Sequence, residues 1–169
     1  MTQVHYILSD SQSRFLFVED EEQLDKALAV LPELPGLSKI IVLDDKGLRH
    51  FEHPQVLSLE ALRQIGVKEL TQAPDALDTL REASSPDHLA ILVYTSGTTG
   101  KPKGAMHHHS GLVYAIRGHT QIIAQTPQDE RMCFLPLCHI AERVGGAFVC
   151  MFTGTKINFV ENPETVPEN

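Results

Sequence analysis

The sequence predicts an α/β fold, a layered arrangement in which a mostly parallel sheet is flanked by helices. Apolar runs of strand length alternate with segments of helical periodicity along the chain, which is typical of a parallel sheet with crossover helices. The run within 39–44 is continuously apolar, as a parallel strand covered on both faces is, and the run at 89–94 is the most apolar strand expected in the chain. Hydrophobic residues make up 42% and charged residues 21% of the chain, so its composition is that of a globular protein with a packed core.

The order of the elements follows from hydrophobic spacing and turn residues. A strand over 14–20 precedes a helix over 20–31, in which Leu24, Leu28 and Leu31 recur at helical spacing. Further strands are expected at 39–44, 89–94, 131–135 and 155–160, and further helices at 58–62 (with Ser58 as the cap), 75–83 and about 110–125. Residues 142–152 are apolar almost throughout and fit a buried helix or a strand; we favour the helix.

Composition and charge exclude several classes of function. The formal net charge is -8, whereas nucleic-acid and anionic-membrane binding need clustered lysines and arginines, so we expect no nucleic-acid partner. No apolar run reaches the roughly 20 residues of a transmembrane segment, and residues 1–10 lack the pattern of a signal peptide. The cysteines at 133, 138 and 150 are odd in number and match no common zinc spacing. They are expected to be reduced thiols in a cytoplasmic protein.

The most informative segment is the loop that follows the apolar run at 89–94. Residues 94–104 read Tyr-Thr-Ser-Gly-Thr-Thr-Gly-Lys-Pro-Lys-Gly. Glycines permit positive φ and close approach of a ligand, and successive backbone N–H groups can form an anion-binding nest to which hydroxyls and lysines add. The candidate phosphate-binding residues are Thr95, Ser96, Gly97, Thr98, Thr99, Gly100, Lys101, Lys103 and Gly104. This density of donors predicts a polyphosphate site, and the plainer alternative is a flexible surface turn.

Two better-known nucleotide-binding loops do not fit this segment. In a Walker A motif aligned on Gly100 and Lys101, the first glycine would fall at Thr95 and the hydroxyl residue after the lysine at Pro102. The dinucleotide fingerprint G-x-G-x-x-G is also absent from the loop.

Residues 94–104 resemble the AMP-binding signature of the adenylate-forming superfamily, which includes acyl-CoA synthetases, luciferases and the adenylation domains of peptide synthetases. A second stretch, Phe-Leu-Pro-Leu-Cys-His-Ile-Ala-Glu-Arg-Val at 134–144, resembles the downstream motif of the long-chain fatty-acid branch. Weaker similarity at 16–20 and 164–169 extends the resemblance along nearly the whole chain. One departure is His-His-Ser-Gly at 108–111, where the family often has Thr-His-x-Asn.

The resemblance implies an acyl-CoA synthetase-like N-terminal domain. Such enzymes activate a fatty acid with ATP and Mg²⁺ to an acyl-adenylate and pyrophosphate, and coenzyme A then takes the acyl group. The residues from Thr95 to Gly100 are implied to hold the β- and γ-phosphates, with Lys101 and Lys103 neutralising them. His139 is implied to line the junction between the acyl pocket and the α-phosphate as a catalytic residue. The alternative is a partly buried histidine bonded to the backbone.

Other polar residues receive structural interpretations. Glu142 and Arg143 are expected to form an ion pair with each other. Cys138 is expected to pack as a small apolar group, because neighbours on an extended segment point apart and a Cys-His nucleophile is therefore disfavoured. The histidines at 107–109 lack a neighbouring carboxylate or thiol, so no protein metal site is expected there.

Residues 1–169 are expected to form part of an N-terminal adenylation domain, without the adenine- and ribose-contacting motifs, the hinge or the C-terminal domain. The isolated chain is accordingly predicted to lack ligase activity. Open sheet edges are expected to favour self-association. Three alternatives remain: a non-catalytic nucleotide-binding module, a non-catalytic interaction module, or another adenylate-forming ligase that takes medium-chain or aromatic acids.

Overall fold

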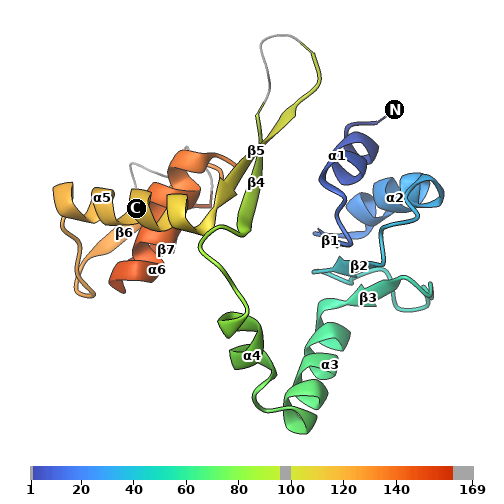
Figure 1. Ribbon diagram of the computed structural model, residues 1–169. Helices are drawn as coiled ribbons and strands as arrows, with labels where there is room; N and C mark the ends of the chain where they lie inside the picture. Colours follow the sequence, from blue (N-terminus) through green and yellow to red (C-terminus); the bar gives the residue numbers. More distant parts are fainter. Residues whose placement is uncertain (1, 96–99, 162–169) are drawn as a thin grey trace. The chain divides into compact units, whose positions relative to one another are not determined.

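The computed structural model describes residues 2–95 and 100–161 (Figure 1). The chain divides into two compact units, Met1–Ala83 and Ser84–Asn169, each with strands and helices of its own. The pairings β1–β2, β2–β3 and β6–β7 are parallel, and β4–β5 is antiparallel. The predicted α/β class with a mostly parallel arrangement of strands is therefore confirmed.

The first unit contains a three-stranded parallel sheet in the order β1-β2-β3. Its elements are α1 (Gln3–Ser11), β1 (Phe15–Val18), α2 (Glu21–Val30), the 3-10 turn η1 (Leu31–Glu33), β2 (Lys39–Val42), β3 (Val56–Ser58), α3 (Leu59–Gln72) and α4 (Ala76–Glu82). Ile40 of β2 pairs with Leu16 on one side and with Val56 on the other. Because β2 is the central strand, its apolar run is buried, as the sequence predicts.

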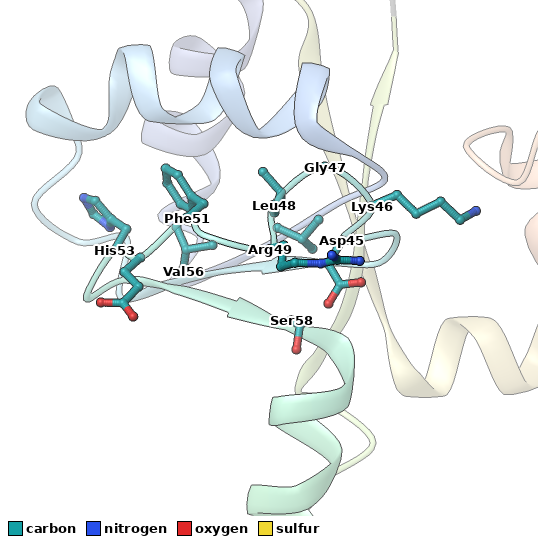
Figure 2. A pocket seen from close by; sticks show the side chains of 11 residues that line it. Asp45, Lys46, Gly47, Leu48, Arg49, Phe51, His53, Val56 and Ser58 are labelled. Carbon is teal, nitrogen blue, oxygen red and sulfur yellow. The ribbon is translucent and has the colours of Figure 1, made fainter.

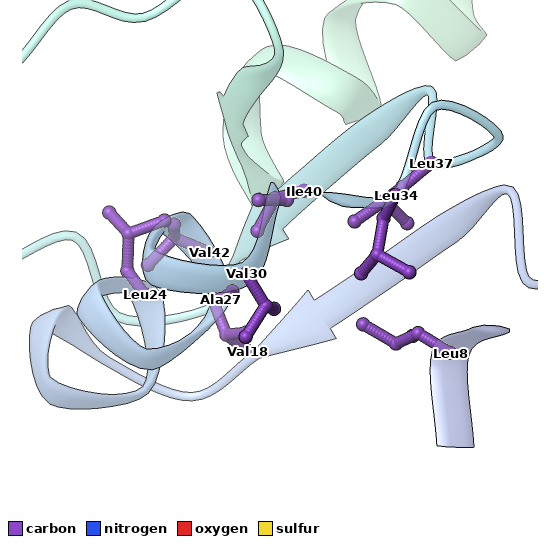
Figure 3. Packing of buried hydrophobic residues seen from close by; sticks show 9 residues of the cluster. All are labelled: Leu8, Val18, Leu24, Ala27, Val30, Leu34, Leu37, Ile40 and Val42. Atoms are coloured by element: carbon purple, nitrogen blue, oxygen red, sulfur yellow. The ribbon is translucent and has the colours of Figure 1, made fainter. Parts of the chain in front are cut away.

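Helix α2 covers one face of this sheet and forms the core with it. Leu24, Ala27 and Val30 recur at helical spacing on one face of the helix and are buried. They belong to one cluster with residues of β1, β2 and the segments beside them, shown in Figure 3: Leu8, Val18, Leu24, Ala27, Val30, Leu34, Leu37, Ile40 and Val42. Complete burial of side chains of this size contributes about 1.5–3 kcal/mol each, so this cluster stabilises the first unit.

Capping side chains fix where the helices of this unit begin. The side chain of Asp20 accepts a hydrogen bond from the Gln23 amide at 3.0 Å, and Ser58 accepts one from the Ala61 amide at 3.1 Å. The predicted helix starts are therefore confirmed, although α3 continues to Gln72 rather than ending near residue 62. Helix α1, capped by Thr2, and the short strand β3 are not predicted by the sequence patterns above.

The second unit is built from two strand pairs and the helices between them. Its elements are β4 (Leu89–Thr95), β5 (Lys103–His108), α5 (His109–Ile122), β6 (Glu130–Cys133), the π-helix η2 (Ala141–Phe148), α6 (Val149–Thr153) and β7 (Lys156–Phe159). Helix α5 contacts β5 as well as η2 and α6, so it links the two strand pairs. The predicted helix near 142–152 is confirmed, but most of it is wound as a π-helix, a form often found at functional sites.

The strand pair β4–β5 departs from the prediction. The run at 89–94 is expected to be a buried strand of a mostly parallel sheet, yet it forms an antiparallel hairpin with β5, and Val93 is its only buried residue. The strand at 103–108 escapes prediction because it is polar, with a lysine and two histidines. No helix among the described residues is both long and apolar enough to span a membrane.

Candidate functional site

The predicted phosphate-binding loop is the connection of the β4–β5 hairpin. Thr95 pairs with Lys103 at the last position of the ladder, so these two residues mark the ends of the loop. Ser96, Gly97, Thr98 and Thr99 lie outside the described residues. Gly100 has a φ of +102°, a conformation that L side chains rarely adopt, so this glycine supplies the positive φ expected of the loop.

The charged part of the loop faces water. Thr95, Lys101 and Lys103 are all exposed to solvent. The hairpin also removes one common source of anion binding, because the loop leads into a strand rather than a helix. Helix α5 begins at His109, at the opposite end of β5. At about 3.4 Å per residue, that helix start is roughly 20 Å from the loop.

Gly104 has a packing role in the hairpin. It lies opposite Tyr94 in the antiparallel register. A Cβ atom at this position would come within 3.1 Å of the Tyr94 ring, closer than ordinary van der Waals contact. Glycine therefore lets the tyrosine ring lie across β5 directly behind the loop, whereas its predicted contact with phosphate remains a prediction.

His139 lies in an exposed loop between β6 and η2. All residues at 134–140 are exposed, so the alternative expectation of a partly buried histidine is wrong. Backbone hydrogen bonds shape the loop around it: the His139 amide donates to the Pro136 carbonyl at 2.9 Å, and the Arg143 amide donates to the His139 carbonyl at 3.0 Å. Cys138 is exposed rather than packed as an apolar group, because this part of the loop has no cover.

The expected ion pair between Glu142 and Arg143 is wrong. Glu142 is fully buried and instead accepts a hydrogen bond from Nη2 of Arg131 at 3.0 Å. Arg143 turns the other way, and its Nε donates to the Leu137 carbonyl at 2.7 Å. Adjacent residues on a helix point in different directions, so a pair between neighbours would have required both side chains to bend towards each other.

Two buried thiols lie near this ion pair. Burial raises the pKa of Cys133, and the negative charge of Glu142 raises the pKa further. Burial also raises the pKa of Cys150, partly offset by the positive charge of Arg131. The structure has all three cysteines free, and the raised pKa values favour the neutral thiol form of the buried pair.

The histidines at 107–109 are distributed over the end of β5 and the start of α5. Nδ1 of His108 forms a hydrogen bond with the Asp87 carbonyl oxygen at 2.6 Å. Within residues 2–95 and 100–161 no group of three or more histidine, cysteine or carboxylate side chains could hold a metal ion.

The first unit has a cavity of about 700 Å³ beside the end of β2 (Figure 2). It is lined by Val42, Asp45, Lys46, Gly47, Leu48, Arg49, Phe51, Glu52, His53, Val56 and Ser58. Several of its polar groups already have partners in the chain. Lys46 pairs with Asp44 at 3.1 Å, His53 accepts a hydrogen bond from the Gln55 amide at 3.2 Å, and the hydroxyl of Ser58 caps α3. These three groups of the cavity wall are therefore already engaged within the chain.

The geometry of the second unit thus presents an exposed cationic loop and an exposed histidine loop. The first can bind an anion, and the second can present an imidazole to a substrate. The sequence motif includes Glu142 but not its partner, because Arg131 lies on the preceding strand. The one available signal was a charged residue within the otherwise apolar strand at 131–135.

Comparison with known proteins agrees with these features. The family model described as AMP-binding enzyme matches residues 2–168. The long-chain-fatty-acid–CoA ligase ACSBG1 of Bos taurus is 30% identical over 161 residues, which cover 92% of this chain and 21% of that protein. The long-chain-fatty-acid–CoA ligase ACSBG2 of Xenopus laevis is 32% identical over 162 residues, covering 93% of this chain and 21% of that protein. The chain therefore spans about a fifth of the length of these relatives.

The fold is similar to that of solved CoA ligases. The crystal structure of the anthranilate CoA ligase AuaEII in complex with anthranoyl-AMP superposes with a TM-score of 0.68 and 22% sequence identity. The match covers 93% of this chain and 28% of that one. At this level of identity the similarity concerns the fold of the polypeptide.

Proposed function

The chain belongs to the AMP-binding enzyme family, and on this premise we propose that it supplies the phosphate-binding loop and part of the acyl site of an ATP-dependent fatty-acid–CoA ligase. Residues 1–169 would be part of the N-terminal adenylation domain of that enzyme. The long-chain ligases among its relatives favour a fatty acid as the substrate. The free thiols fit a reducing cytoplasm, the compartment we propose.

The observation that carries the proposal is the cationic hairpin loop. Lys101 and Lys103 are exposed on either side of Pro102, next to a stretch of four hydroxyl residues and two glycines at 95–100. In the adenylation step, a carboxylate oxygen of the acid attacks the α-phosphorus of Mg-ATP, and the bond to the bridging oxygen of the β-phosphate breaks. Negative charge then moves onto the departing pyrophosphate, where fixed donors and ammonium groups stabilise it.

In the second step the thiol of coenzyme A loses its proton to solvent and attacks the acyl carbonyl carbon. A thioester bond forms, and AMP leaves with the electrons of the acyl–phosphate bond. His139, exposed between β6 and η2, is the residue we propose at the junction between the acyl chain and the α-phosphate. We propose that the isolated chain does not complete the reaction.

The test is calorimetric titration of the chain with magnesium pyrophosphate and with Mg-ATP. The variant Lys101→Ala/Lys103→Ala should lose binding of both. Its matched control is Lys26→Ala/Lys68→Ala, which removes two exposed positive charges from helices of the first unit and should bind normally. Equal binding by both double variants would contradict the proposed role of the loop.

A non-catalytic nucleotide-binding module is the second candidate, because the exposed lysines of the hairpin loop could bind phosphate whether or not catalysis follows. It predicts the same binding but no contribution from His139. Transfer of an acyl group by the purified chain would refute both this candidate and the proposed inactivity.

We also propose self-association, since Phe15 and Phe17 are exposed on the edge strand β1. A monomeric mass in light scattering would contradict it.

A further inference from the structure

A buried ion pair closes the base of the loop that carries His139. Strand β6 ends at Cys133 and η2 begins at Ala141, so residues 134–140 connect them. Arg131 lies on β6, and Glu142 is the second residue of η2. The 3.0 Å contact between Nη2 and Oε1 therefore joins the two ends of the loop. This contact restrains the separation of β6 and η2.

The surroundings of Glu142 are shaped around its carboxylate. The side chain is completely buried. A Cβ atom at Gly146, within the same helix, would collide with the carboxylate and would lie 2.9 Å from its Cδ and 3.2 Å from Nη2 of Arg131. Glycine at this position is therefore what leaves room for the ion pair.

Fold stability alone does not account for this arrangement. Oε2 of Glu142 and Nε of Arg131 are buried and have no hydrogen-bond partner among the described residues. A buried ion pair with unsatisfied atoms contributes little to stability, and apolar side chains of similar volume often serve a fold as well or better. The charged pair must offer something that apolar packing would not, and a fixed geometry across the loop is one such property.

A second arginine holds the loop from its other side. Nε of Arg143 donates to the Leu137 carbonyl at 2.7 Å, two residues before His139. No residue of 134–140 is buried, so polar contacts rather than packing hold this segment. His139 is thus flanked by two hydrogen bonds from Arg143. One runs from Nε to the Leu137 carbonyl, and the other runs from the Arg143 amide to the His139 carbonyl.

We propose that Glu142, Arg131 and Arg143 are positioning residues that hold His139 in place for the adenylation step. The proposal rests on the proposed function, in which His139 meets the substrate. Glu142 and Arg131 fix the ends of the loop, and Arg143 fixes its middle. None of the three needs to touch the substrate, since each acts through the backbone that carries the histidine.

The test measures the order of His139 directly in the chain labelled with ¹⁵N and ¹³C. In the variants Glu142→Gln and Arg143→Ala, the NMR order parameters of residues 137–140 should fall to below about 0.6, the range of flexible backbone. The control is Arg117→Ala, which removes an exposed arginine from α5 and should leave these values unchanged. Arg143→Lys keeps a donor and should retain part of the order.

A merely structural role gives a different result. It would lower the thermal midpoint of Glu142→Gln without loosening residues 137–140 well below that midpoint. Should Glu142→Gln fail to fold, Arg143→Ala decides the matter, because it removes only a surface hydrogen bond. Unchanged order in Arg143→Ala would overturn the proposal. Pyrophosphate binding, measured on the same samples, should not change in any of these variants. If the unmodified chain did not bind pyrophosphate, that result would count against the proposed function and not against the positioning of His139.

Discussion

Replacing Glu142 alone should destabilise the second unit far more than replacing it together with Arg131. Removing one partner of a buried ion pair typically costs about 3–5 kcal/mol, because the remaining charge is left without compensation. The side chain of Arg131 is 29% exposed and that of Glu142 is 0% exposed, so water can partly solvate the arginine. We therefore expect Glu142→Met to cost about 3 kcal/mol, at the lower end of that range.

The double variant Arg131→Met/Glu142→Met should be much closer to the unmodified chain. Methionine is unbranched like both residues it replaces, and it leaves no unpaired charge. Replacement of both partners by apolar residues is often neutral, so we expect a cost of about 1 kcal/mol or less. Arg131→Met leaves the buried carboxylate of Glu142 without a partner and should also cost at least about 3 kcal/mol. The two single costs then sum to about 6 kcal/mol against about 1 kcal/mol for the double variant, which is a coupling of about 5 kcal/mol in a double-mutant cycle.

The assay is urea unfolding followed by methyl NMR signals. The chain has no tryptophan, so fluorescence of that residue cannot report unfolding. The methyl signals of Val149, which is fully buried, follow unfolding of the second unit. Those of Leu24 follow unfolding of the first unit and serve as an internal control. With a slope of about 1 kcal/mol per molar urea for a small unit, a loss of 3 kcal/mol moves the midpoint by about 3 M. A double variant whose cost equals the sum of its two single variants would refute the reasoning.

Further predictions concern the core, a helix cap and the thiols. Leu24→Ala should cost the first unit about 2–5 kcal/mol in urea unfolding, because Leu24 is 1% exposed in the core; a cost below 1 kcal/mol would contradict that packing. Ser58→Ala should cost about 1 kcal/mol by loss of the cap on α3, measured as a lower helical signal in circular dichroism, and Ser58→Gly should cost less. An alkylating reagent at neutral pH should modify Cys138 rapidly and Cys133 and Cys150 only on unfolding, counted by mass spectrometry. Because burial raises the pKa of both buried thiols, their contribution to stability is complete below the ordinary thiol pKa and is lost as pH rises through the folded value.

Local signals predicted the first unit well. The apolar run at 39–44 and the leucine spacing of α2 depend only on the burial of the side chains concerned, so they are legible in the sequence. Strand β3 is three residues long and is held by its pairing with β2, a contact distant in sequence. Helix α1 was not predicted because only His5 and Leu8 of this helix are buried, and its polar residues outnumber them.

The second unit shows where sequence patterns mislead. The run at 89–94 has the apolar composition of a central parallel strand, but strand direction depends on where the chain goes next. Here it returns through a loop as polar β5. Likewise, the ion pair between Glu142 and Arg143 was predicted because the two residues are adjacent in sequence. The observed partner of Glu142 is Arg131, which lies on strand β6. The motif residues were found, and the tertiary contact that supports them could be seen only in the structure.

The hairpin geometry also limits how tightly this chain can bind phosphate. Lys101 and Lys103 are exposed, and among the described residues the loop leads into strand β5 rather than into a helix, so binding depends on two exposed ammonium groups and local donors. At 4 Å in bulk water a pair of unit charges gains only about 1 kcal/mol, but the gain rises to about 4 kcal/mol where the surroundings are partly dehydrated. An affinity near 1 mM corresponds to about 4 kcal/mol, which two solvated lysines and a few hydrogen bonds can supply. We therefore expect weak binding of pyrophosphate that falls steeply as salt is added, since exposed charges are screened. Micromolar binding that resists salt would mean that the loop is already dehydrated in this chain, and the fully solvated picture of the site would have to be abandoned.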